Sequence, residues 1–366
     1  GSICGLCENM DYKEKLKELS TEEKITLLTG YDGFSAVNLP EKNLNGIKMA
    51  DGPYGLKTKK GDTVCYPNPC LTACSWDEEV CRKIGDYLGR DCVNHGVDLL
   101  LAPAINIKRN PLGGRNFEYY SEDPVLTAKL AAGYVEGVKN NGVAVCVKHF
   151  ACNNQEKDRW VYNCVVSDDA LRNLYLTAFE ILLKNVEVDC VMAAYNRIND
   201  VYCCENSYIL QDILRKEWGF TGAIETDAAV GIHMLDKKAM ANAVCAGQDL
   251  WLWGGSATAF DDYKDNPTVA LAVREAARRI LYAELHANVM NGVKATTMFV
   301  RITPWWQKAL VMIKIIATSL TILCLCYFAL SFFVQSKAFG GEVTENADVN
   351  AGGSDENTGV AKSVYG

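Results

Sequence analysis

The chain has 366 residues, of which 49% are hydrophobic and 22% are charged, and its formal net charge is −8 at pH 7. That length suits one large domain or two ordinary ones. Nucleic-acid binding needs clustered Lys and Arg, and the chain has no such run, so we expect no nucleic-acid partner. Uncharged substrates are not excluded.

From residue 11 to about residue 290, helical patterns alternate with short apolar runs. The first helical pattern covers residues 12–30 and contains the capping signal Ser-Thr-Glu-Glu. Further helical patterns are each followed by an apolar run: 77–96 by 97–107, 124–142 by 143–151, 169–187 by 188–196, and 207–220 by 221–228. Fully apolar strands that alternate with helices predict parallel strands covered by helices.

The predicted strands end in polar residues, as in "AINIKR", "KHFACNNQE", "AAYNRIND" and "IETDAAV". Polar groups at one end of successive parallel strands mark the active face of a β/α barrel. An open doubly wound sheet also carries function there, but it usually has a G-x-G-x-x-G fingerprint, which is missing here. The sequence therefore predicts an α/β fold, a (β/α)8-type TIM-like barrel over residues 1–290.

Beyond residue 290 the composition changes. The stretch Ile315–Val334 has twenty residues and no charge, which gives a helix of about 30 Å, the thickness of a hydrocarbon core. We expect a linker over 291–308, a single transmembrane helix over 309–334 and a disordered acidic tail over 335–366. A buried core helix is the alternative. The Lys and Arg residues before the span favour a cytoplasmic barrel, although an upstream span would change that.

Sixteen cysteines are scattered along the chain and not set in repeated pairs. Cys4 and Cys7 form one C-x-x-C, but a zinc site of that kind needs a second pair. Several others lie in apolar runs, where a thiol acts as a small hydrophobic group. We expect free thiols, no metal and no cofactor, which favours a reducing compartment or an anaerobic habitat.

Four polar clusters are candidates for a functional site. "MADGPYGLK" places Asp51 before Gly and Pro, which alone indicates a turn. "NIKRNPLGGRNFEYYSEDP" mixes charges with aromatic rings, which suits polyol binding but also a solvated loop. Lys148 and His149 directly follow a buried strand, and as neighbours on a strand they point to opposite faces. Tyr195 and Asp227 stand at later strand ends, and the ordinary interpretation of Asp227 is a helix cap.

Taken together, these strings resemble family 3 of the glycoside hydrolases. "DGPYG", "NIKRNPLGGRNFEYYSEDP", "KHFACNNQE", "VMAAYNRIND", "LRKEWGF" and the Asp of "IETDA" occur in the family's order over about residues 11–290. The chain looks like the β-glucosidase branch, because it lacks the "KHFPGHG" pattern of the β-N-acetylhexosaminidase branch.

The resemblance implies a β-linked oligosaccharide or glycoside as substrate and Asp227 as the catalytic nucleophile. It also implies residues that hold the hydroxyls of the sugar in the first subsite: Asp51, Arg115, Lys148 and His149. Arg159 and Tyr195 match residues that line the same pocket, and Glu118 orients an arginine side chain. A retaining glycosidase pairs an ionised nucleophile with a protonated acid, and adjacent cations favour the ionised form.

The sequence departs from the family's pattern in three ways. Ala228 stands where the family usually has Trp after the nucleophile, so one wall of the sugar site must be supplied differently. The acid/base Glu normally comes from a second α/β domain, which has no counterpart here. A membrane span follows the barrel directly. The chain also begins with Gly and Ser instead of Met, so we expect a permuted, membrane-anchored member whose upstream α/β domain supplies the acid/base.

Two other functions remain open from the sequence. One is a non-catalytic sugar-binding or scaffold barrel that has lost its acid/base partner. The other is a glycoside phosphorylase, although no anion cradle is evident. The sequence does not distinguish glucose from xylose, because no residue excludes the hydroxymethyl group by which they differ.

Overall fold

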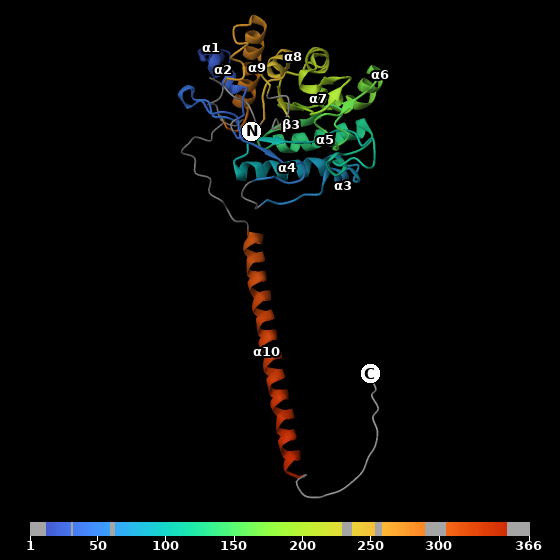
Figure 1. Ribbon diagram of the computed structural model, residues 1–366, viewed down its shortest axis with the longest axis vertical. Helices are drawn as coiled ribbons and strands as arrows, with labels where there is room; N and C mark the ends of the chain where they lie inside the picture. The colour runs from blue at the N-terminus through green and yellow to red at the C-terminus, as the bar shows by residue number, and fades with distance from the viewer. Residues whose placement is uncertain are drawn as a thin grey trace. The chain divides into compact units, whose positions relative to one another are not determined.

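A computed structural model describes residues 12–30, 32–58, 63–228, 236–252, 258–289 and 305–349, with side chains of the last range described as far as Val334. The chain divides into two units, Gly1–Phe299 and Val300–Gly366. The first holds all the described strands, and the second holds one helix, α10, Trp305–Val349 (Figure 1).

Five parallel strands form the main sheet, in the order β1-β2-β3-β5-β8. Their bounds are Met49–Asp51 for β1, Leu99–Leu101 for β2, Ala144–Phe150 for β3, Cys190–Ala193 for β5 and Ala223–Thr226 for β8. A smaller sheet, which the sequence did not predict, joins β4 (Asn163–Cys164), β6 (Arg197–Ile198) and β7 (Val201–Tyr202).

The main sheet is buried on both faces. Along β3, Val145 and Val147 belong to one core cluster, whereas Ala144 and Cys146 belong to another. The first cluster includes side chains of α4 (Glu78–His95), α5 (Pro124–Lys139), α7 (Thr177–Asn185) and η5 (Tyr208–Glu217). The second includes side chains of α1 (Tyr12–Glu18), α2 (Thr21–Leu27), α8 (Lys237–Ala246) and α9 (Pro267–His286). The prediction of parallel strands covered by helices is confirmed.

The regular eight-stranded barrel is not confirmed in the described part of the chain. Single bridges continue the sheet from β8, pairing Glu225 with Leu250 and Trp251 with Thr29. The series then returns to β1 through two antiparallel bridges, Gly30 with Ala36 and Ser35 with Lys48. These pairings are too short and too irregular for the eight equivalent parallel strands of a regular barrel.

The helices begin and end largely where the sequence predicts. Ser20 caps α2 in a capping box with Glu23, and Asp77 and Gly96 bound α4. The pattern at 169–187 forms three short pieces: α6 (Asp168–Ala170), η3 (Leu171–Tyr175) and α7. The remaining short elements are η1 (Pro40–Lys42), α3 (Pro69–Ala73), η2 (Asn116–Glu118) and η4 (Cys203–Glu205).

Helix α10 is longer than the predicted span of 309–334. It begins at Trp305, within the predicted linker, and runs to Val349, within the predicted disordered tail. No proline interrupts those residues, so nothing in the sequence forces the helix to stop where its apolar part ends. Residues 350–366 of the predicted tail lie outside the described residues.

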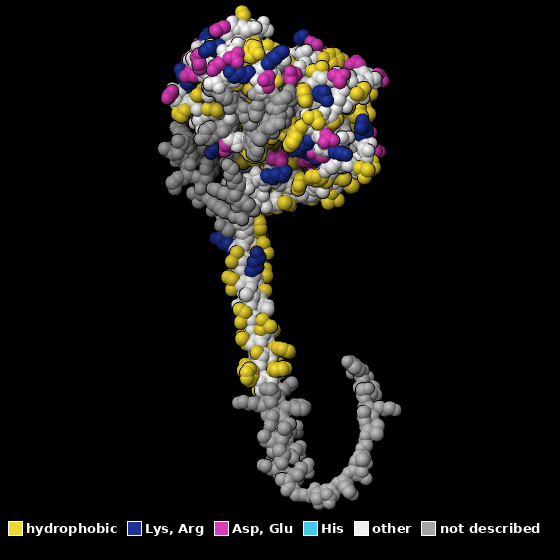
Figure 2. Space-filling model, in the orientation of Figure 1, with side chains coloured by type: hydrophobic (Ala, Val, Ile, Leu, Met, Phe, Trp, Pro, Cys, Tyr) yellow, Lys and Arg dark blue, Asp and Glu magenta, His cyan; other side chains and the backbone are white. Residues whose placement is uncertain are grey.

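The apolar part of α10 is long enough to cross a membrane. The most apolar 18-residue window of Trp305–Val334 has a mean hydropathy of 2.3. Figure 2 shows hydrophobic side chains along this length. A buried core helix can have the same length and composition. Length and composition alone remain weak evidence for a membrane span.

Candidate active site

The ends of the strands bring the predicted site residues together. Asp51 ends β1, and Lys148 and His149 lie near the end of β3. Tyr195 follows β5 and Asp227 follows β8. Because these parallel strands are neighbours in the sheet, their carboxyl ends meet at one edge.

Asp51 and Lys148 form a buried ion pair. Lys148 Nζ lies 2.5 Å from Asp51 Oδ1, and the lysine side chain is only 3% exposed. Lys57 Nζ approaches the other oxygen, Oδ2, at 2.7 Å. Burial alone would raise the pKa of Asp51, but the two ammonium groups outweigh it and hold that pKa well below its usual value. Asp51 is therefore ionised, and it holds the Lys148 ammonium beside it at the strand ends.

Two arginines of the site also have their own carboxylates. Arg115 pairs with Glu118, which is buried, so Glu118 orients an arginine as the sequence predicts. Burial opposes the charge of Arg115, but the hydrogen bond to Glu118 and nearby negative groups, Asp227 among them, raise its pKa overall. Arg159 Nη1 lies 3.0 Å from Glu156 Oε2.

Asp227 differs from the other carboxylates of the site. Its Oδ1 accepts from the backbone N–H of Ala228 at 2.8 Å. Its Oδ2 is buried without a hydrogen-bond partner, and the nearest base is His149, whose Nε2 lies 3.6 Å away. No described lysine or arginine is ion-paired with Asp227. The lysines and arginines of the site are thus paired with carboxylates other than Asp227: Lys57 and Lys148 share Asp51, Arg115 pairs with Glu118 and Arg159 with Glu156.

His149 is held neutral and in one orientation. Burial, and then the positive charges of Arg115, Lys148 and Arg159, lower its pKa well below the usual value. The Asn106 side chain donates to the His149 carbonyl at 2.8 Å, and its Oδ1 accepts from the His149 backbone N–H at 2.9 Å. The same Oδ1 lies 3.4 Å from His149 Nδ1 and accepts from it in the tautomer that carries the proton on Nδ1. In that tautomer the unprotonated Nε2 faces Asp227 Oδ2, so that two acceptors lie 3.6 Å apart.

The structure explains how neighbours on one strand serve one site. The sequence rule places Lys148 and His149 on opposite faces of β3. The register between β3 and β5 shifts between Lys148 and Phe150. Such an irregularity re-aims a side chain. Lys148 can therefore contact Asp51 while His149 contacts Asp227.

Aromatic side chains form one side of the site. The Tyr195 ring lies 5.0 Å from the Arg159 guanidinium and 6.2 Å, edge to face, from the ring of Trp160. Burial, together with the negative charge of Asp227, raises the pKa of Tyr195. Trp160 is 47% exposed, so an aromatic surface is open to solvent beside Tyr195.

Sequence reasoning did not select four residues that shape the site: Lys57, Asn106, Glu156 and Trp160. Lys57 and Asn106 lie inside quoted polar clusters but show no spacing that marks them. Glu156 and Arg159 are three residues apart, a spacing that could have suggested their pairing. The aromatic role of Trp160 depends on its contact with Tyr195, which the sequence does not show.

Comparison with known proteins adds independent information. The model for the glycosyl hydrolase family 3 N-terminal domain matches residues 43–282. Thermostable beta-glucosidase B of Acetivibrio thermocellus is 40% identical over 229 residues, covering 60% of this chain and 30% of that protein. An exo-alpha-(1->6)-L-arabinopyranosidase of Bifidobacterium breve is 41% identical over 224 residues, covering 58% and 30%.

A solved structure is similar over about three quarters of the chain. Beta-glucosidase 3B from Thermotoga neapolitana in complex with glucose has a TM-score of 0.67 and 35% sequence identity, covering 76% of this chain and 43% of that chain. The matched region thus spans less than half of that protein and about a third of the curated relatives.

Proposed function

This chain belongs to glycosyl hydrolase family 3, and we propose that it provides the sugar site and the nucleophile of a retaining β-glycosidase. The enzyme removes terminal β-linked sugars in the manner of a β-glucosidase or β-xylosidase. The observation that carries the proposal is the state of Asp227. It is the carboxylate at the strand ends that no described lysine or arginine neutralises, and its Oδ2 makes no hydrogen bond.

The reaction assigned to Asp227 is a double displacement. Its carboxylate oxygen forms a bond to the anomeric carbon while the bond from that carbon to the leaving oxygen breaks, and a protonated acid gives that oxygen its proton. Water activated by the same group then hydrolyses the glycosyl-enzyme. Because this chain spans about a third of its curated relatives, we assign the acid/base to a domain outside the part they share with it.

Several charged groups are placed to bind the sugar. Asp51 and Glu118 are acceptors, whereas Lys148 and Arg115 are donors, so hydroxyls can both donate and accept at this site. Arg159 and Tyr195 line its aromatic side. Ala228 is too small to form the wall of the sugar site that a Trp usually provides at that position. We assign this wall to Trp160, because its ring is exposed beside Tyr195.

The substrate is assigned by class. The two curated relatives are named as a beta-glucosidase and an exo-alpha-(1->6)-L-arabinopyranosidase. Glucose, xylose and arabinopyranose glycosides are all neutral pyranosides, which suits a site whose cations are already paired with carboxylates of the protein.

Two structural proposals accompany this function. The bridges that lead from β8 back to β1 close the sheet into a barrel-like ring around the site. The apolar part of α10 anchors the protein to a membrane as a single pass. Membrane flotation tests the anchor: the full chain should float with vesicles, whereas residues 1–299 expressed alone should not. Equal behaviour of the two would refute the anchor.

Labelling with an activated 2-fluoro glucoside tests the nucleophile. Such a reagent needs no acid catalyst, because its leaving group departs as an anion, so it reports on Asp227 without the acid/base. Peptide mass mapping should place the label on the peptide that contains Asp227, and Asp227→Asn should abolish it. The exposed Asp212→Asn variant is a control that should label normally.

Absence of label in folded protein that still binds glucose would favour the alternative, a non-catalytic sugar-binding or scaffold protein. Full activity on cellobiose by this chain alone would refute the proposal that another domain supplies the acid/base.

A further inference from the structure

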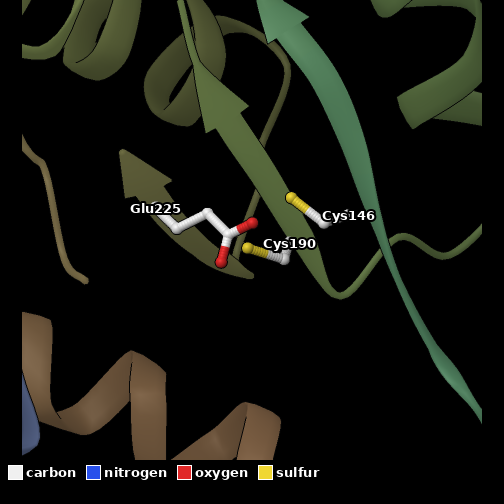
Figure 3. A group of neighbouring side chains, drawn as sticks. All are labelled: Cys146, Cys190 and Glu225. Carbon is white, nitrogen blue, oxygen red and sulfur yellow. The ribbon is translucent and has the colours of Figure 1, made fainter. Parts of the chain in front are cut away.

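Three side chains that can bind a metal meet inside the protein, below the strand ends that carry the site. Cys146 of β3, Cys190 of β5 and Glu225 of β8 each offer a ligand atom, and these atoms lie within 4.8 Å of one another. Cys146 and Cys190 are paired residues of neighbouring strands. Figure 3 shows the Glu225 carboxyl turned towards the two sulfur atoms.

Glu225 is a buried carboxyl without a partner. It is 0% exposed, and neither of its oxygens makes a hydrogen bond. It borders a small cavity, about 10 Å³ for the centre of a water-sized sphere, whose remaining lining is Cys190 and apolar side chains such as Met49 and Leu99. A carboxyl in such surroundings carries a large desolvation cost unless something binds it.

We propose that Cys146, Cys190 and Glu225 bind a Zn²⁺ ion. Zinc takes thiolate sulfur at about 2.3 Å and carboxylate oxygen at about 2.0–2.2 Å, usually in a tetrahedron. In that geometry the ligand atoms are about 3.5–3.8 Å apart, so a side-chain adjustment of the order of 1 Å suffices. The cavity beside Glu225 has room for about one water molecule as the fourth ligand.

The charges of the site are consistent with a divalent cation. Two thiolates and one carboxylate around Zn²⁺ leave a net charge of −1, and Lys148 is close enough to interact favourably with it.

This proposal is independent of the glycosidase assignment, because its experiment measures metal and not turnover. The full chain is purified in detergent in a Cys4→Ser/Cys7→Ser background, since that C-x-x-C could itself bind zinc. After reduction and chelation, the protein is loaded with Zn²⁺ and freed of excess metal by gel filtration. Elemental analysis should then find one zinc per chain.

Variants locate the ion. Cys146→Ser and Cys190→Ser should each lower the stoichiometry by at least fivefold. Cys92→Ser, which changes an equally buried thiol in α4, should retain it. If the site variants do not fold, Co²⁺ bound to the background protein still shows whether thiolates bind the metal, because thiolate ligands give an intense charge-transfer absorption. The proposal would be overturned if the background protein did not retain zinc, if both site variants retained it, or if Cys92→Ser lost it. Cobalt binding without the charge-transfer absorption, or a Cys146–Cys190 disulfide found by thiol counting, would overturn it as well.

Discussion

Replacing Asp51 by Asn leaves the ammonium of Lys148 buried beside other cations without its counter-charge. Lys148 is 3% exposed and Asp51 is 21% exposed, so this pair is screened much less than a surface ion pair. Breaking a fully buried pair costs about 3–5 kcal/mol, and the partial exposure of Asp51 lowers our expectation to about 2–4 kcal/mol. With about 2–4 °C per kcal/mol, the melting temperature should fall by about 4–16 °C.

Differential scanning calorimetry of the full chain measures this effect. Asp212→Asn is the matched control, because it breaks an ion pair with Lys216 at 2.7 Å whose side chains are 71% and 48% exposed. The control should change the stability by less than about 0.5 kcal/mol. Equal melting temperatures for the two variants would refute the reasoning that Asp51 holds a buried charge.

The effect of Asp51→Asn on stability should also depend on pH. The pKa of Asp51 is depressed in the folded protein, so its contribution is present above the unfolded value of about 3.9 and is lost as pH falls towards the folded value. The gap in stability between the native protein and Asp51→Asn should therefore be constant from pH 6 to 7 and shrink below about pH 4. A gap that widens in acid would contradict the assigned charges.

Three further predictions concern other parts of the protein. Trp160→Ala should lower kcat/KM for an aryl glucoside with an activated leaving group by about tenfold, the effect of about 1.4 kcal/mol of lost contact, whereas Trp305→Ala should leave it unchanged. Gly137→Ala should destabilise the protein by about 1–3 kcal/mol, because its Cβ would lie 2.1 Å from the Arg82 carbonyl oxygen of α4; urea unfolding measures this. Burial raises the pKa of Glu284 to about 8, so stability to urea should fall as pH rises from about 4 to 8, and Glu284→Gln should flatten that decline.

The sequence predicts the strands and helices well because they are set by local patterns. Capping residues such as Asp77 and Gly96 mark where a helix begins and ends, and the apolar pattern between them predicts that it is a helix. The closure of the sheet is different. It depends on single bridges, such as that between Trp251 and Thr29, which join residues distant in the sequence and show no periodic pattern.

The candidate site shows the same division. The resemblance selected Asp51, Lys148 and Asp227, and the structure places them at one edge of the sheet. The pairing of charges was not predictable, because Lys57 and Lys148 are both candidate partners of Asp51 and only geometry shows that both contact it. The cluster of Cys146, Cys190 and Glu225 was missed, because each residue alone is an ordinary part of an apolar strand.

The arrangement around His149 leads to a last prediction, about the substrate. With the proton on Nδ1, beside the Asn106 oxygen, Nε2 and Asp227 Oδ2 face each other as two acceptors 3.6 Å apart. Two acceptors repel unless a donor lies between them, and a sugar hydroxyl is such a donor.

Removing the hydroxyl that binds His149 from a dinitrophenyl glucoside should therefore cost about 1–3 kcal/mol, which is about 5–150-fold in kcat/KM. In His149→Leu the same deletion should cost much less, because no acceptor at that position is left unpaired. Monodeoxy substrates tested on both proteins identify this hydroxyl. If, for every hydroxyl, the loss in kcat/KM from its deletion were the same in His149→Leu as in the native protein, His149 would contact none of them. That result would refute the proposal that His149 accepts a hydrogen bond from the sugar.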